Sequence, residues 1–238
     1  KAALDLFNLA LGLAGPSLTA FELIARRPLD FLLEAMPSVR DPLPARHDWY
    51  VLAEISSGRS SEDARQLIET IFGQAIEAGY VKDAALAGSI AQGQAFWKMR
   101  EDMPGAQAPQ GASIKHDISV PVHLVPEFLE RADALVLAAM PDARICPFGH
   151  MGDGNIHYNV SQPRGGDAKA FMARREELND IVHALVVSLG GSISAEHGIG
   201  RLKREMLAKV KSPVEMAMMR AVKQALDPRG IMNPGKLL

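Results

Sequence analysis

The sequence feature that most constrains the fold is a glycine-rich reversal between two segments that can both form strands. The segments 145–150 and 155–161 flank the tetrapeptide MGDG. Glycine adopts the positive φ angles that a tight reversal between strands requires. The pattern therefore predicts an antiparallel hairpin that brings His150 and His157 towards each other from adjacent strands.

The rest of the chain alternates strand-like and helix-like patterns, with amphipathic or capped helices between the strands. Further strands are expected at 17–25, 49–56, 84–90 and 114–123. The strand at 49–56, the helix capped by Ser60 and the strand at 84–90 suggest a local β-α-β unit. Because later strands pair locally, the sequence predicts an α+β fold. We expect a mainly antiparallel sheet with helices on one face, as in a ferredoxin-like cap, and a C-terminal helical segment.

Composition excludes several classes of protein. The chain has 26 Lys and Arg against 28 Asp and Glu, a net charge of −2 that provides no broad positive field for nucleic acid. No apolar run approaches the ~20 residues that span a bilayer. The single cysteine, Cys146, excludes a disulfide scaffold or a cysteine-rich zinc module and is expected to be a packed thiol. Because the first residue is Lys1 within an apparent helix, we expect the chain to be part of a longer protein.

The hairpin histidines are candidate metal ligands. His157 and Asn159 are two positions apart on one strand, so their side chains share a face. Two facing imidazoles and one carboxylate suit zinc, iron or manganese. Glu196, in the segment GGSISAEHGIG, is the candidate third ligand. Histidines bonded to the turn and a solvated glutamate in a loop would explain the same pattern. The remaining histidines outside these two segments suit surface or structural roles: His47, His116, His123 and His183.

Three blocks of sequence carry a family resemblance: PFGHMGDGNIHYNV, GGSISAEHGIG and the C-terminal LDPRGIMNPGKLL. In order and spacing they resemble the C-terminal half of FAD-linked D-2-hydroxy-acid dehydrogenases. That group includes D-lactate dehydrogenases, D-2-hydroxyglutarate dehydrogenases and the flavin subunit of glycolate oxidase, on the vanillyl-alcohol-oxidase flavoprotein fold. WKMRE and IKHDISVP are further local matches. The resemblance covers the whole chain and implies FAD held mainly by an N-terminal half outside it.

The resemblance assigns roles to residues of the two histidine-containing segments. His150, His157 and Glu196 match metal ligands, with zinc favoured and manganese or iron as alternatives. His197 matches the catalytic base that takes the hydroxyl proton of the substrate. Asn159 matches an amide that supports the metal site or contacts the substrate.

Other matches concern the carboxylates of the substrate and the flavin domain. Arg100 and Lys115 match basic residues that hold substrate carboxylates, although an ordinary salt bridge and a solvated edge-strand lysine are the alternatives. Relatives that act on a five-carbon diacid place a hydroxyl side chain where this chain has Pro104, which puts the pocket for a second carboxylate in doubt and leaves a smaller monoacid such as D-lactate open. Asn233 and Lys236 match the segment that returns to the flavin domain and are expected to contribute to cofactor binding.

The resemblance implies an FAD-dependent enzyme that oxidises a D-2-hydroxy acid to the 2-oxo acid, with this fragment inactive alone. Residues 1–195 would form the substrate-binding cap, and 196–238 a helical segment packing towards the FAD-binding domain. The expected partners are the substrate, that FAD-binding domain and an electron-acceptor protein or quinone, with a homodimer left open. The expected location is the cytoplasm, or the mitochondrial matrix in a eukaryote. A catalytically silent cap or docking domain and a free-standing metallohydrolase are the alternatives.

Overall fold

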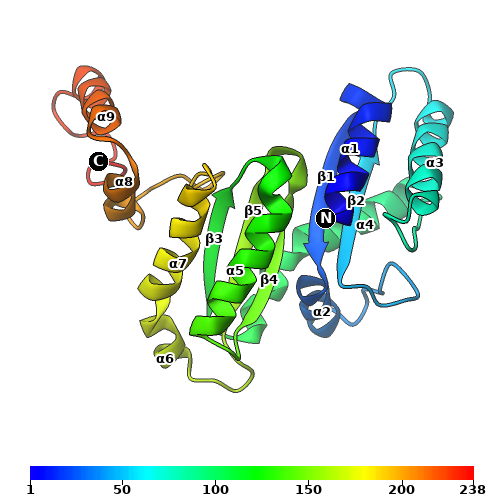
Figure 1. The fold of residues 1–238 in the computed structure, drawn as a ribbon, viewed down its shortest axis with the longest axis horizontal. Helices are drawn as coiled ribbons and strands as arrows, with labels where there is room; N and C mark the ends of the chain where they lie inside the picture. Colours follow the sequence, from blue (N-terminus) through cyan, green and yellow to red (C-terminus); the bar gives the residue numbers. More distant parts are fainter.

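The computed structural model describes residues 1–238 as one five-stranded sheet with helices packed around it and a helical arm at the C-terminus (Figure 1). Every pair of neighbouring strands is antiparallel, and the order across the sheet is β2-β1-β4-β5-β3. The strands are β1 Leu18–Ala25, β2 Trp49–Ile55, β3 Ser113–Ser119, β4 Arg144–His150 and β5 Asn155–Ser161. The helices are α1 Ala2–Ala14, α2 Arg26–Ala35, α3 Ser61–Glu77, α4 Ile90–Ala106, α5 Val125–Ala139, α6 Ala168–Ala173, α7 Arg175–Ser188, α8 Arg204–Val210 and α9 Pro213–Leu226.

The predicted hairpin is confirmed as β4 and β5, which lie in the middle of the sheet. Its register pairs Phe148 with His157. The reversal ends at Gly154, whose φ is 74°. A Cβ atom there would lie 1.9 Å from the carbonyl oxygen of Val120. Glycine is therefore required at this position both for its backbone angle and for the close approach of a neighbouring segment.

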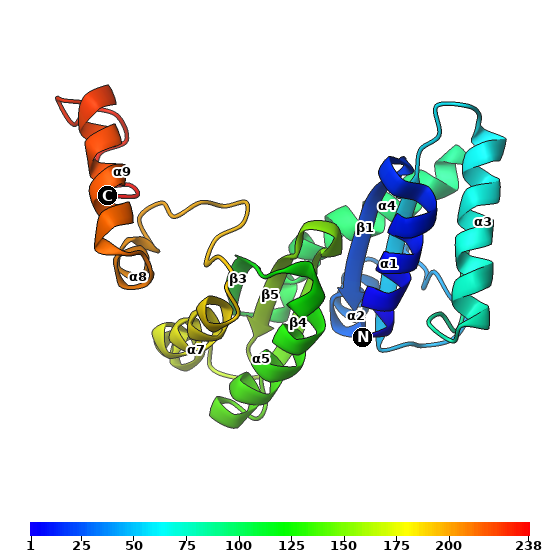
Figure 2. The same ribbon diagram turned by 45° about the horizontal axis from the view of Figure 1, so that its top comes forward.

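One face of the sheet is apolar and carries the main core. Alternate residues of β5, namely Ile156, Tyr158 and Val160, point into it and are fully buried. Helices α1, α5 and α7 lie along this side (Figure 2). Phe7 of α1 packs edge to face against Phe21 of β1 at a ring-centroid distance of 5.1 Å. The period-two alternation of each strand thus separates an apolar face from a polar one.

The opposite face is covered only in part, by α2 and α4. A smaller apolar cluster forms there between these two helices and the strands. Its buried members are Ile24, Leu29, Leu32, Tyr50, Met103, Ala106 and Phe148. The α+β class and the antiparallel sheet are confirmed, but helices pack on both faces of the sheet rather than on one.

The strand predicted at 84–90 is wrong, and no β-α-β unit forms. Residues 78–89 are a connecting loop in which Ser89 accepts a hydrogen bond from the backbone N–H of Gln92 and so begins α4. β2 pairs with β1 in antiparallel fashion instead. The apolar residues in this stretch favour a strand, but a helix cap and a local turn determine the backbone conformation.

The C-terminal arm consists of α8, α9 and the residues that follow them, and it stands away from the sheet in both views (Figures 1 and 2). Leu207 and Met216 are buried within it. Many of its other large apolar side chains are exposed: Val214, Met218, Val222, Leu226, Ile231 and Met232. The expected C-terminal helical segment is therefore present. No helix of the chain has both the length and the apolar composition needed to cross a membrane.

Candidate metal and substrate site

His150, His157 and Glu196 come together on the polar face. The Nε2 atom of His150 lies 3.1 Å from Oε1 of Glu196, and Nε2 of His157 lies 3.8 Å from Oε2 of the same carboxylate. One potential ligand atom from each residue lies within 4.8 Å of the others. The fold therefore brings the three ligands predicted from the sequence to one point, although Glu196 is far from the hairpin in sequence.

A buried carboxylate stands behind each of the two imidazoles. Glu22 of β1 contacts Nδ1 of His150, and Oδ1 of Asp117 in β3 lies 3.9 Å from Nδ1 of His157; each carboxylate side chain is 2% exposed. The carboxylate at Nδ1 of His150 favours the tautomer that keeps its proton there and leaves the Nε2 lone pair free. The distance from Asp117 to His157 is too long for a hydrogen bond, so that carboxylate acts on the ring by its charge. Both rings present Nε2 towards Glu196, as ligands of one ion would do.

Asp117 also holds the loop that carries Glu196. Its Oδ2 atom accepts hydrogen bonds from the backbone N–H groups of Ala195 at 3.1 Å, Glu196 at 3.0 Å and His197 at 2.9 Å. Burial alone would raise the pKa of Asp117, but the backbone donors of His197 and Glu196 hold that pKa below its ordinary value. The ionised carboxylate therefore anchors the Glu-His dipeptide against β3.

His197 lies beside the three ligands and faces solvent. Its ring stacks on that of His157 at a centroid distance of 5.8 Å, and its Nδ1 atom is 3.9 Å from Oδ2 of Asp117. The side chain is 62% exposed. Asp117, His157 and His197 form a second group that could bind a metal. Since the oxygens of Asp117 already accept backbone hydrogen bonds, His150, His157 and Glu196 are the better-suited set.

Arg100 reaches the same site through Glu22. Its Nε atom donates to Oε2 of Glu22 at 2.6 Å, while the other oxygen of that carboxylate contacts His150. The guanidinium lies 4.8 Å from the ring centroid of Phe148, and the residue is buried. Arg100 is therefore part of a buried chain of charged groups that leads to the candidate ligand His150, not a surface ion pair.

Lys115 and Asn159 share the polar face and are paired in register between β3 and β5. Asn159 is buried and donates from Nδ2 to Oε1 of Gln107 at 3.0 Å. Lys115 is exposed and lines a cavity of about 490 Å³ together with His197. Arg100 lines a different cavity, so the structure places the two basic residues on one face but not in one pocket.

The two residues predicted to bind the cofactor lie elsewhere. Asn233 and Lys236 are in the exposed turn that follows α9, where Nζ of Lys236 donates to the carbonyl of Pro234 at 3.3 Å. The backbone N–H of Leu237 donates to the carbonyl of Gly200, which ties this turn to the segment just before α8. Neither predicted residue contacts the ligand cluster.

Glu22 and Asp117 were not predicted from the sequence. Each is an acid within an apolar strand pattern, and Asp117 is two positions after Lys115, which places both on one face. Acids are rarely fully buried unless they are paired, so an acid within a core strand is the signal that could have identified them. Cys146, by contrast, is a packed thiol as expected, and burial raises its pKa to about 11.

Comparisons with known proteins agree with this architecture. The profile of the family "FAD linked oxidases, C-terminal domain" matches residues 2–237. A D-2-hydroxyglutarate dehydrogenase of Stutzerimonas stutzeri is 40% identical over 92% of this chain and 47% of its own length. A mitochondrial D-2-hydroxyglutarate dehydrogenase of Arabidopsis thaliana is 33% identical over 94% of this chain and 38% of its own length. The chain thus spans less than half of these relatives.

A solved structure shares the fold. The 4-ethylphenol oxidase of Gulosibacter chungangensis, determined as an isoeugenol complex, superposes with a TM-score of 0.58 at 15% sequence identity. The match covers 99% of this chain and 50% of that one. At this identity the likeness concerns the fold alone.

Proposed function

This chain belongs to the family of C-terminal domains of FAD-linked oxidases, and we propose that it binds substrate and metal in an FAD-dependent D-2-hydroxy-acid dehydrogenase. The full-length protein oxidises a D-2-hydroxy acid to the 2-oxo acid. The names of its relatives support this class of reaction. The observation that carries the proposal is that the Nε2 atoms of His150 and His157 converge on Glu196. A buried carboxylate lies on the Nδ1 side of each ring.

The donor set suits a divalent ion. Two imidazole nitrogens and a carboxylate are common zinc ligands and leave a position open for substrate, while manganese and iron are the alternatives. Burial, then the charge of Arg100, lowers the pKa of His157 and favours the neutral form that binds metals. His150, His157 and Glu196 would hold the ion. A bound divalent ion would supply Lewis-acid polarisation of the substrate hydroxyl, and FAD would supply the hydride acceptor.

The remaining residues orient the substrate and move its proton. His197, exposed beside the ligands, accepts the hydroxyl proton of the substrate as general base. Arg100 offers its guanidinium to a substrate carboxylate, and Lys115 adds a positive charge on the same face. The side-chain amide of Asn159 stabilises the site through its hydrogen bond to Gln107.

FAD binds mainly to the part of the full-length protein outside this chain. Residues 1–195 form the substrate-binding cap, and 196–238 pack towards the FAD-binding domain. The exposed apolar side chains of α9 support this orientation, because they have no partner within the chain. Asn233 and Lys236, at the end of the arm, contribute to the cofactor site from there. An electron-acceptor protein or a quinone would reoxidise the flavin, in the cytoplasm or in the mitochondrial matrix of a eukaryote.

Turnover of the full-length protein tests the proposal. D- and L-lactate and D- and L-2-hydroxyglutarate are supplied with an artificial electron acceptor, before and after removal of metal by a chelator. We expect oxidation of a D enantiomer only, loss of activity on chelation and recovery when a divalent metal is restored. Activity that survives both chelation and the Glu196→Gln substitution would overturn the metal assignment. Failure with every D-2-hydroxy acid would overturn the reaction class.

A further inference from the structure

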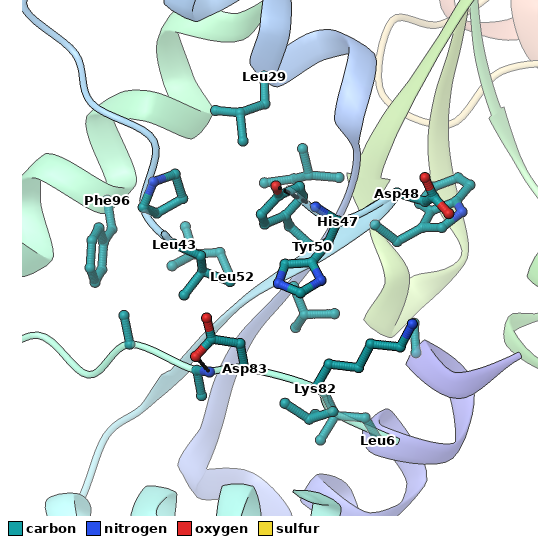
Figure 3. A pocket seen from close by; sticks show the side chains of 18 of the residues that line it. Leu6, Leu29, Leu43, His47, Asp48, Tyr50, Leu52, Lys82, Asp83 and Phe96 are labelled. Carbon is teal, nitrogen blue, oxygen red and sulfur yellow. Dashed lines mark hydrogen bonds between the residues drawn. The ribbon is translucent and has the colours of Figure 1, made fainter. Parts of the chain in front are cut away.

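An apolar cavity of about 350 Å³ shares Arg100 with the candidate site. Figure 3 shows side chains that line this cavity. It lies at the edge strand β2, next to the smaller apolar cluster that α2 and α4 form. The N-terminal turn of α1, one residue of α3 and the segments 42–48 and 80–85 complete its lining. Most of its lining is hydrophobic, including Leu29, Leu43, Leu52, Phe96 and Met103. A concave, mainly apolar space of this size with a few polar groups is typical of a small-molecule site.

A short chain of contacts joins this cavity to the metal ligands. Arg100 lines the cavity and bonds to Glu22, which contacts His150. Phe148 packs under the guanidinium of Arg100, and its ring centroid lies 5.2 Å from that of His157. Within the chain Arg100 donates from Nε alone, so its two terminal nitrogens are free to bind a carboxylate. The cavity therefore begins where the proposed substrate carboxylate is held.

The charged groups around the cavity do not select a second anion. Lys82 lines the wall, but Asp48 and Asp83 line it as well (Figure 3). Pro104, one helical turn after Arg100, has no hydroxyl to offer a distal carboxylate. A second carboxylate in this space would meet two acids and a largely apolar wall, which makes its desolvation costly.

We propose that the cavity receives the side chain of the substrate, and that this substrate is a D-2-hydroxy monocarboxylic acid with a branched aliphatic or aromatic side chain. This inference rests on the proposed function and specifies its substrate class. The single carboxylate pairs with Arg100, the hydroxyl faces the metal ligands, and the side chain occupies the space between α4 and β2. D-lactate, with only a methyl group, would leave most of the cavity unfilled.

Substrate preference of the full-length, FAD- and metal-loaded protein tests this inference. The kcat/KM values of D-2-hydroxyisocaproate, D-lactate and D-2-hydroxyglutarate are compared. Since each buried methylene favours binding by roughly fourfold, we expect D-2-hydroxyisocaproate to exceed D-lactate by tenfold or more. A preference for D-2-hydroxyglutarate over both, or equal values for all three, would overturn the inference while leaving the reaction class intact.

A cavity-filling variant and a matched control test whether the substrate preference depends on this cavity. Leu43 is a half-buried loop residue in the wall, whereas Leu135 is a 45% exposed residue of α5 outside the cavity. Leu43→Trp should lower the preference for D-2-hydroxyisocaproate over D-lactate about tenfold, and Leu135→Trp should leave it unchanged. An unchanged preference in Leu43→Trp, or an equal loss in the control, would contradict the assignment.

A binding measurement keeps the two proposals separable. 4-Methylpentanoate has the carboxylate and the side chain but no hydroxyl to oxidise, so its affinity by calorimetry requires no turnover. We expect 4-methylpentanoate to bind at least tenfold more tightly than propanoate, and Leu43→Trp to abolish that difference. If no hydroxy acid is oxidised but this difference appears, the cavity assignment stands and the reaction class fails. Equal affinities of the two acids would overturn the cavity assignment.

Discussion

The two faces of the sheet are formed by alternate residues of the same strands, yet they are stabilised in different ways. On the apolar face, Ile156 and Tyr158 of β5 are fully buried among helices α1, α5 and α7. On the polar face, His157 lies between them in sequence and is surrounded by charged groups. The buried carboxylates Glu22 and Asp117 on this side are costly to desolvate and are offset by Arg100 and by backbone donors.

This contrast indicates that alternate residues of each strand have different roles. Burial of apolar area on one face supplies most of the folding free energy. The other face uses hydrogen bonds and charge pairs to hold the candidate ligands at fixed positions. A substitution on the apolar face should therefore change stability more than metal binding, and a substitution on the polar face should do the reverse.

The largest effect is expected from the polar face. Replacing His197 by Asn removes the proposed general base and should lower kcat of the full-length protein by ~10²–10⁴-fold. Because the side chain is 62% exposed, its loss should change the thermal midpoint little. Steady-state kinetics measures kcat, and a melting curve on the same preparation measures the thermal midpoint. An unchanged kcat would remove His197 from the mechanism.

The next effect belongs to the apolar face. Ile118 is fully buried and adjacent to Asp117 on β3, but points to the opposite side of the sheet. Ile118→Ala should lower the free energy of unfolding by about 2–5 kcal/mol, because it leaves a cavity in the main core. Denaturant unfolding measures this loss, and metal content per folded chain should stay constant. Loss of the metal without loss of stability would show that the two faces are not separable.

Stability should also fall in acid because of two histidines on the apolar side. Burial lowers the pKa of His116 to about 4, and burial and Lys203 lower that of His183 to about 4, against an ordinary value of 6.5. Between pH 6.5 and 4 the unfolded chain binds protons that the folded chain does not. Each of the two histidines therefore lowers the free energy of unfolding by about 1.4 kcal/mol for each pH unit as the pH falls through this window.

Denaturant unfolding at several pH values separates this effect from other titrating groups. The variant His183→Gln should show a shallower loss of stability than the wild type between pH 6.5 and 4. Identical slopes would mean that His183 is not held neutral in the core.

A smaller effect is expected for the buried carboxylate that anchors the Glu-His loop. Asp117→Asn keeps the size of the side chain but removes the charge that accepts the backbone N–H groups of Glu196 and His197. Metal affinity should fall by about 10–100-fold, as is usual when a group supporting a ligand histidine is changed. Competition with a chromogenic chelator measures the affinity. An affinity equal to that of the wild type would assign Asp117 a purely structural role.

How far the sequence predicts this site depends on the range of the interactions involved. The hairpin and its two histidines follow from local rules, because two glycines and the strand period place them. Glu196 is a candidate because it stands beside His197 in a glycine-rich segment, and the family resemblance supports that role. Its position beside the hairpin follows from the tertiary fold. Glu22 could not be assigned, because its role depends on the pairing of β1 with β4, which the sequence of either strand does not specify. The strand predicted at 84–90 is wrong for the opposite reason, since the local cap of the next helix at Ser89 determines the backbone rather than the apolar run.

The most direct test of the account is the metal content of the purified full-length protein, measured by mass spectrometry after dialysis. We expect one divalent ion per chain in the wild type and loss of that ion in both His157→Ala and Glu196→Gln. The exposed control variant Leu135→Trp should retain it. A wild-type protein that oxidises a D-2-hydroxy acid without metal, or variants that keep a full complement of metal, would contradict the claim that the polar face of the sheet is a metal site.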